Sequence, residues 1–62
     1  MLKEEEKAQI KEAHLTAMER RLYSLELDYI GTEAAGDKKS CRQLEVQIEA
    51  MKKAIQAVRE RG

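Results

Sequence analysis

The chain has 62 residues and a mass of 7.1 kDa, so it forms one small domain at most. Below about 70 to 80 residues a single hydrophobic core seldom supplies more than a few kcal/mol, so we expect this chain to need a partner. With no proline, three glycines, 39% charged and 42% hydrophobic residues, the composition favours long amphipathic helices over a β-sandwich or a small metal-bound domain. Twelve basic and twelve acidic side chains give zero net charge, which disfavours a non-specific binder of nucleic acid or of an anionic membrane.

The start of the chain and its one cysteine bear on where the protein works. The sequence opens with Met1, Leu2 and five charged residues, and no run of strictly apolar residues exceeds two. We therefore expect no signal peptide, no membrane span and a cytoplasmic protein. Cys41 alone can supply neither an intrachain disulfide nor a cysteine cluster, so nothing favours an oxidising compartment or a zinc fold.

A first long helix is predicted over residues 2–30. Apolar residues recur there at alternating spacings of three and four, which keeps one stripe of a helix apolar. Carboxylates (Glu5, Glu12, Glu19, Glu26) and basic groups (Lys7, His14, Arg21) flank the stripe, as in a coiled coil. The stripe is polar over the first heptad, which we expect to overhang and fray. Its apolar members, the first half of the predicted hairpin seam, are Leu15, Met18, Leu22, Leu25 and Tyr29.

A second helix is predicted over residues 38–61, with the same spacing. Its seam residues are Leu44, Ile48, Met51, Ile55 and Val58, with Cys41 on the same stripe. Residues 1–30 carry five basic and seven acidic side chains, whereas residues 38–62 carry seven basic and three acidic ones. An antiparallel arrangement therefore sets unlike charges side by side. The fold class that follows is all-α, a coiled-coil-like antiparallel two-helix hairpin spanning residues 1–62.

The turn is predicted over residues 31–37. Gly31 suits the left-handed C-cap of the first helix. The second helix has three candidate starts: a cap by Asp37, a cap by Ser40 with Gln43 three residues later, or an earlier start at Thr32.

No residue pattern predicts an enzyme, a cofactor, a small-molecule substrate or a metal site. His14 has no carboxylate, histidine or cysteine at ligand spacing on its helix face, and no nucleophile to activate. Gly31 and Gly36 resemble the glycines of a phosphate loop, but an acid stands in the place of its lysine. Cys41 is expected as a buried small hydrophobe. Asp28, Glu33 and Asp37 offer a metal-binding tip as an alternative to helix caps, which explain them more simply.

Apolar residues off the seam predict a contact surface. A lone two-helix hairpin has no second layer to cover them, so we expect them to bury against another polypeptide. Scattered surface hydrophobes, which are normal on proteins, are the alternative. The residues predicted to bind a partner are Tyr23, Leu27, Ile30, Val46 and Ala50.

The residues from about 22 to 58 carry a resemblance to a known family. The motifs are Gly36-Asp37-x-Lys39, then Leu44-x2-Gln47-x2-Ala50-Met51-x2-Ala54-Ile55-x2-Val58, and before the turn Leu22-x2-Leu25-x2-Asp28-Tyr29-Ile30. In these the chain resembles the hairpin co-chaperones of type III secretion needle subunits, of the YscE and PscE type.

The resemblance implies a role in protein transport and virulence. It implies a cytoplasmic hairpin that binds a TPR-like chaperone and, through it, keeps the needle subunit unpolymerised before export. The family has no catalytic residues. A homodimer of hairpins that forms a four-helix bundle, as a scaffold or a regulator, remains the alternative.

Overall fold

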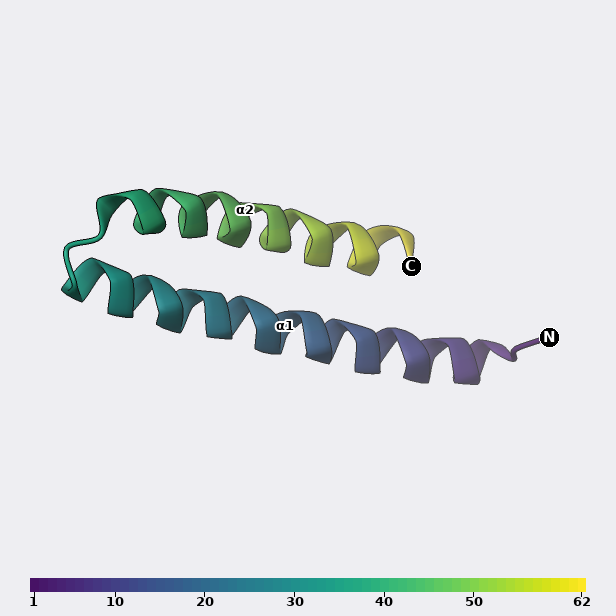
Figure 1. Cartoon of the computed structure of the whole chain (residues 1–62). Helices are drawn as coiled ribbons and strands as arrows, with labels where there is room; N and C mark the ends of the chain where they lie inside the picture. The colour runs from purple at the N-terminus through teal and green to yellow at the C-terminus, as the bar shows by residue number, and fades with distance from the viewer.

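A computed structural model describes all 62 residues as two helices and no strand. Helix α1 spans Glu4–Ala34 and helix α2 spans Lys38–Arg61. The two helices lie side by side in antiparallel directions, and residues 35–37 join them (Figure 1). The predicted all-α, antiparallel two-helix hairpin is therefore confirmed.

The hairpin is a rod. Its principal extents are 50, 16 and 13 Å, and its radius of gyration is 15.0 Å. A compact domain of this length has a radius of gyration of about 10.6 Å. The first ten residues extend beyond the end of α2, because it is Lys11 that reaches the backbone oxygen of Gly62 (Figure 1). The predicted overhang of the first heptad is thus present, and α1 is helical there from Glu4.

Helix α1 continues past Gly31, where the sequence pattern predicted its end. It ends instead in a Schellman motif: the Gly36 amide donates to the Glu33 carbonyl at 3.0 Å, and the Asp37 amide donates to the Thr32 carbonyl at 3.0 Å. Gly36 has a φ of 75°, a left-handed conformation that glycine adopts without a Cβ clash. Gly31 costs some helix propensity, but the extra turn places Thr32 on the seam opposite Cys41.

Helix α2 begins with a cap by Asp37, one of the three predicted starts. Its carboxylate accepts a hydrogen bond from the Ser40 amide at 3.1 Å and another from the Ser40 hydroxyl at 2.6 Å. This is the usual bond from an N-cap side chain to the third helical residue. The starts at Ser40 and at Thr32 are wrong, because Ser40 lies inside α2 and Thr32 lies inside α1. Asp37 therefore serves both helices within a three-residue connection.

The apolar seam fills the space between the helices. Only Leu15 and Ile55 are buried, with 5% and 6% of their surface still exposed. The other eight seam residues are half-buried: Met18, Leu22, Leu25, Tyr29, Leu44, Ile48, Met51 and Val58. Full burial of such a side chain stabilises a fold by about 1.5 to 3 kcal/mol. Because only two seam residues are buried, the core stabilises the hairpin only modestly.

Cross-helix contacts set the register of the hairpin. Lys11 meets Gly62 at one end, and the hydroxyl of Thr32 meets the thiol of Cys41 at 3.3 Å at the other. Counting inward from these contacts places Leu15 opposite Val58. The ion pairs follow the predicted charge complementarity at one place, where Arg59 pairs with Glu19 across the helices. The other two ion pairs, Lys7 with Glu4 and Lys52 with Glu49, lie within single helices.

Candidate partner-binding surface

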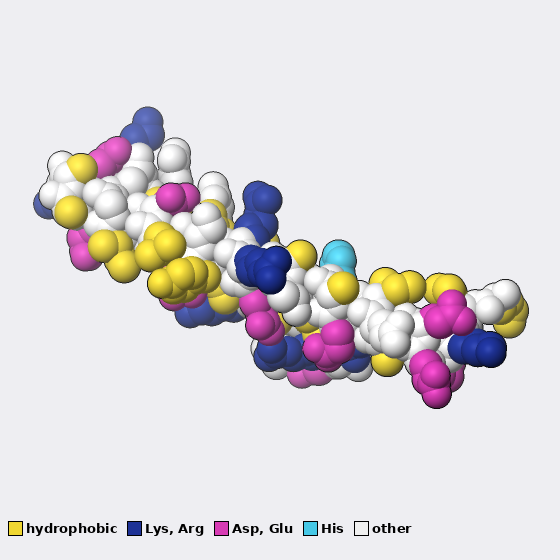
Figure 2. Space-filling view, turned by 90° about the horizontal axis from the view of Figure 1, so that it is seen from below, with side chains coloured by type: hydrophobic (Ala, Val, Ile, Leu, Met, Phe, Trp, Pro, Cys, Tyr) yellow, Lys and Arg dark blue, Asp and Glu magenta, His cyan; other side chains and the backbone are white.

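Three large apolar side chains form a patch on the outer face of α1. Tyr23, Leu27 and Ile30 are 63%, 48% and 61% exposed, and we call them the α1 patch. Leu27 lies two residues from both Leu25 and Tyr29, so at about 100° per residue it points some 160° away from either seam residue. Figure 2 looks onto α1 and shows apolar side chains gathered toward its turn end. Leu27 therefore points away from α2, whereas Tyr23 and Ile30, each one residue after a seam residue, lie about 100° from the seam on the flank of α1.

The border of the α1 patch is mostly acidic or small. Residues three and four positions apart are neighbours on a helix surface, and this rule gives the patch seven bordering residues. They are Glu19, Arg20, Ser24, Glu26, Gly31, Glu33 and Ala34. Glu19, Glu26 and Glu33 follow each other at intervals of seven along the side next to Tyr23 and Ile30, and we call them the acidic edge. Ser24 and Gly31 flank Leu27 on the opposite side, and we call them the small edge. Arg20, four residues before Ser24, lies on that side as well.

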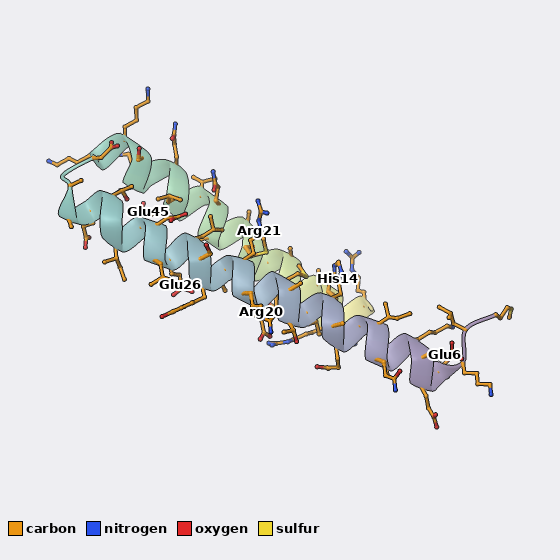
Figure 3. The ribbon with its side chains drawn as sticks, turned by 60° about the horizontal axis from the view of Figure 1, so that its bottom comes forward. Glu6, His14, Arg20, Arg21, Glu26 and Glu45 are labelled. Carbon is orange, nitrogen blue, oxygen red and sulfur yellow. The ribbon has the colours of Figure 1, made fainter.

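The acidic edge carries carboxylates that the hairpin leaves unneutralised. Glu19 is paired with Arg59, whereas Glu26 and Glu33 make no ion pair. Figure 3 shows Glu26 projecting from α1 into solvent, on the same helix as Arg20. Arg20 is the one cation among the seven bordering residues. The field around the patch is therefore negative along one side.

The five residues predicted to bind a partner do not share one patch. Val46, which is 70% exposed, lies two residues from both Leu44 and Ile48 and so points away from the seam on the far side of α2. The outer faces of the two helices look in opposite directions, so Val46 and Leu27 cannot contact one flat surface together. Ala50 is exposed on α2 as well. The structure therefore brings together Tyr23, Leu27 and Ile30 and separates them from the other two.

The exposed area exceeds what a compact protein of this mass presents. The chain exposes 5231 Å². A compact monomer of this mass exposes about 4,100 Å². The excess, about 1,100 Å², is larger than the about 800 Å² that each partner contributes to a standard protein interface. The hairpin thus has room for one such interface.

Two open grooves lie beside the turn, and most of the residues that line them are polar or charged. One runs between the helices next to the small edge and is lined by Leu27, Asp28, Gly31, Thr32, Ser40, Gln43, Leu44 and Gln47. The other lies on the opposite side and is lined by Tyr29, Glu33, Gly36, Asp37, Lys38, Cys41, Arg42 and Glu45. Both are surface depressions of the hairpin rather than enclosed cavities for a small molecule.

Two titrating groups near the turn are perturbed by structural hydrogen bonds. The Ser40 hydroxyl and then the Ser40 amide hold the pKa of Asp37 below its ordinary value. The phenol of Tyr29 donates to Glu45 Oε1 at 3.0 Å, and this bond, followed by the charge of Glu45, raises the pKa of Tyr29. The first shift belongs to a helix cap and the second to a cross-helix contact.

The remaining candidate groups lie on the surface or in the seam. His14 is exposed on α1 (Figure 3). Cys41 is half-buried and unbridged, and its thiol contacts Thr32. No group of three or more histidine, cysteine, aspartate or glutamate side chains is placed to hold a metal ion, so Asp28, Glu33 and Asp37 do not converge. Neither helix combines the length and the apolar character that crossing a bilayer requires.

Two features of the surface were not predicted from the sequence. Lys11 falls on the seam stripe, and its Nζ donates to the Arg59 and Gly62 backbone oxygens at 3.0 and 3.2 Å. The second feature is the acidic edge. Its glutamates recur every seven residues in the sequence, a spacing that predicts charge pairs between the two helices of the hairpin. Only one of them, Glu19, forms such a pair.

A comparison with protein-family models, with curated proteins and with solved structures finds no match.

Proposed function

We propose that this chain is a non-enzymatic binding protein, a small cytoplasmic co-chaperone that stabilises a larger helical partner. Following the resemblance noted above, the partner is a TPR-like chaperone of type III secretion. Through it the hairpin helps to keep the needle subunit unpolymerised before export. The observation that carries the binding role is the α1 patch: three large apolar side chains, each about half exposed or more, on one face of a hairpin with two buried residues.

The energetics support a partner. Covering a side chain of this size contributes about 1.5 to 3 kcal/mol before the entropy of association is subtracted. Tyrosine is one of the residue types that carry much of the affinity of a protein contact when they are packed at its centre, and Tyr23 belongs to the patch. Because the hairpin has so little core of its own, a partner that covers the patch also stabilises the fold, by mass action.

The test is co-purification from the native host, with bound proteins identified by mass, for the original chain and for Leu27→Asp with Ile30→Asp. Both positions are exposed, so the double variant keeps its helicity in circular dichroism. We expect it to lose a helical-repeat chaperone and a needle-type subunit, because two carboxylates cannot be buried unpaired. The matched control is Ala13→Asp with Thr16→Asp, two exposed positions of α1 outside the patch, which retains both. Equal recovery with the double variant and the original chain contradicts the assignment.

The second candidate is a homodimeric four-helix bundle that serves as a scaffold or a regulator. A row of alanines on α2 favours it, because Ala50, Ala54 and Ala57 follow spacings of four and three and let another helix approach closely. Light scattering at micromolar concentration separates the two candidates. A monodisperse dimer with cooperative melting supports the scaffold, whereas a poorly stable species rescued by a second protein supports the co-chaperone.

A further inference from the structure

We propose that the partner element covering the α1 patch is an amphipathic helix with lysines or arginines along one edge of its apolar face. The inference rests on the proposed binding function and adds the chemistry of the partner. It follows from the asymmetry of the two borders of the patch, one acidic and one small.

The acidic edge supplies the charge argument. A helix laid over Tyr23, Leu27 and Ile30 covers the space beside Glu26 and Glu33, and neither carboxylate has a cation in the hairpin. Opposite charges at the rim steer encounter and set register, whereas like charges oppose docking. A basic edge on the partner satisfies both carboxylates, and an acidic edge is repelled.

The small edge fixes the other side of the contact. Ser24 and Gly31 flank Leu27 with no long side chain, and a Cβ built on Gly31 meets no side chain and no atom of α2 within 4 Å. A neighbouring helix can therefore approach more closely on this side than over the glutamates. The distance between two packed helices depends on the side chains at their contact. Because Ser24 and Gly31 occupy little space, large apolar side chains of the partner can fill the room beside Leu27. The partner helix has one orientation in which its basic edge lies over the acidic edge.

A second copy of this chain does not meet these requirements. Two α1 patches packed antiparallel around a two-fold axis bring the same edges together, so Glu26 faces Glu26 of the copy. Two patches packed in parallel set the acidic edge of each copy against the side that carries Ser24, Gly31 and Arg20, where one cation meets three carboxylates. The outer face of α2 is basic, with Lys39 and Lys53, but Val46 is its single large exposed hydrophobe.

The test uses three synthetic helical peptides with identical leucine faces and with lysine, glutamine or glutamate along one edge. Each is titrated into the isotope-labelled full chain, and binding is followed by NMR shifts of backbone amides. We expect the lysine peptide to bind about five- to tenfold more tightly than the glutamate peptide, with the largest shifts at Tyr23, Leu27 and Ile30, since exposed ion pairs contribute modestly. We expect the affinity of the glutamine peptide to fall between the other two. Raising the salt to about 0.5 M, roughly three times the physiological concentration, should reduce the difference in affinity between the lysine and glutamate peptides.

Charge reversal provides the decisive variant. Glu26→Lys with Glu33→Lys should invert the order, so that the glutamate peptide binds best. The control, Glu49→Lys with Glu60→Lys, makes the same change in net charge on exposed positions of α2 and should leave the order unchanged. An order that ignores the reversal overturns the basic-edge inference, as does the absence of binding by every peptide.

The failure of this inference is distinguishable from failure of the proposed function. If Leu27→Asp with Ile30→Asp abolishes binding of all three peptides while charge reversal has no effect, the patch binds a partner but the basic edge is wrong. If the shifts map to α2 instead, the assignment of the patch itself is overturned. If the chain alone forms a dimer that the same double variant dissociates, a second copy occupies the patch and the inference falls.

Discussion

The ammonium group of Lys11 donates a hydrogen bond to the Gly62 backbone oxygen at 3.2 Å and to the Arg59 carbonyl at 3.0 Å. It thus satisfies carbonyls that have no partner within α2 and places a cation at the negative end of that helix. Lys11→Ala should therefore fray the last turn of α2, which amide hydrogen exchange at residues 58–61 measures. We expect faster exchange there and little change near the turn.

The control for this prediction is Lys7→Ala, one turn earlier on α1. Lys7 pairs only with Glu4 of its own helix and lies on the part of α1 that extends beyond α2. Equal exchange at the end of α2 in the two variants would show that Lys11 does not cap it.

The two glycines near the turn should respond to alanine in opposite directions. Gly31 lies inside α1 with open space around an added Cβ, so Gly31→Ala should stabilise the hairpin by about 0.5 to 1 kcal/mol. Gly36 has a left-handed φ of 75°, so Gly36→Ala should destabilise it by about 1 to 2 kcal/mol. Denaturant titration by circular dichroism measures both. If α1 ended at Gly31, the effect of its substitution would have the opposite sign.

The core of the hairpin should be sensitive at its most buried positions. Ile55 is 6% exposed, and Ile55→Ala should lower the free energy of unfolding by about 2 to 4 kcal/mol, enough to unfold much of an isolated hairpin. Val46→Ala is the matched control, because Val46 is 70% exposed, and we expect a change within about 0.5 kcal/mol. Thermal melts followed by circular dichroism compare the two. Similar losses at both positions would contradict the hairpin seam.

The Tyr29 phenol provides a pH test of the cross-helix contact. Its pKa is raised above the ordinary value of 10.0 because it donates a hydrogen bond to the Glu45 carboxylate. A pKa raised in the folded state means that this contribution to stability is fully present below pH 10 and is lost as the pH rises through the raised value. Tyrosinate absorbance in a Tyr23→Phe background reports Tyr29 alone, since the chain has two tyrosines. Adding Glu45→Gln should lower the midpoint, and an unmoved midpoint would show that the contact does not form.

Spacing alone was enough to predict two helices and the stripe on each, because a 3.6-residue period places residues three and four apart on one face. Every predicted seam residue, from Leu15 to Val58, is buried or half-buried in the hairpin. The cap at Asp37 was also among the predicted starts, since its carboxylate needs only the amide three residues later. Local chemistry decides such features.

The end of α1 required more than local chemistry. Gly31 and Gly36 are both suitable for ending a helix, and the sequence does not rank them. The choice of Gly36 depends on the opposite helix, because one more turn of α1 brings Thr32 to Cys41.

The sequence by itself determined the fold class, the seam and the presence of apolar residues beyond it, since all three follow from helical periodicity and the capping chemistry of single residues. Tertiary structure alone decided that Tyr23, Leu27 and Ile30 form a separate patch from Val46. It also decided that Glu19 is used within the hairpin while Glu26 and Glu33 are not. The physical reason is that both features depend on how the two helices are placed against each other. That placement decides which surface a side chain shares and which charge it meets, and the sequence of one helix does not specify it.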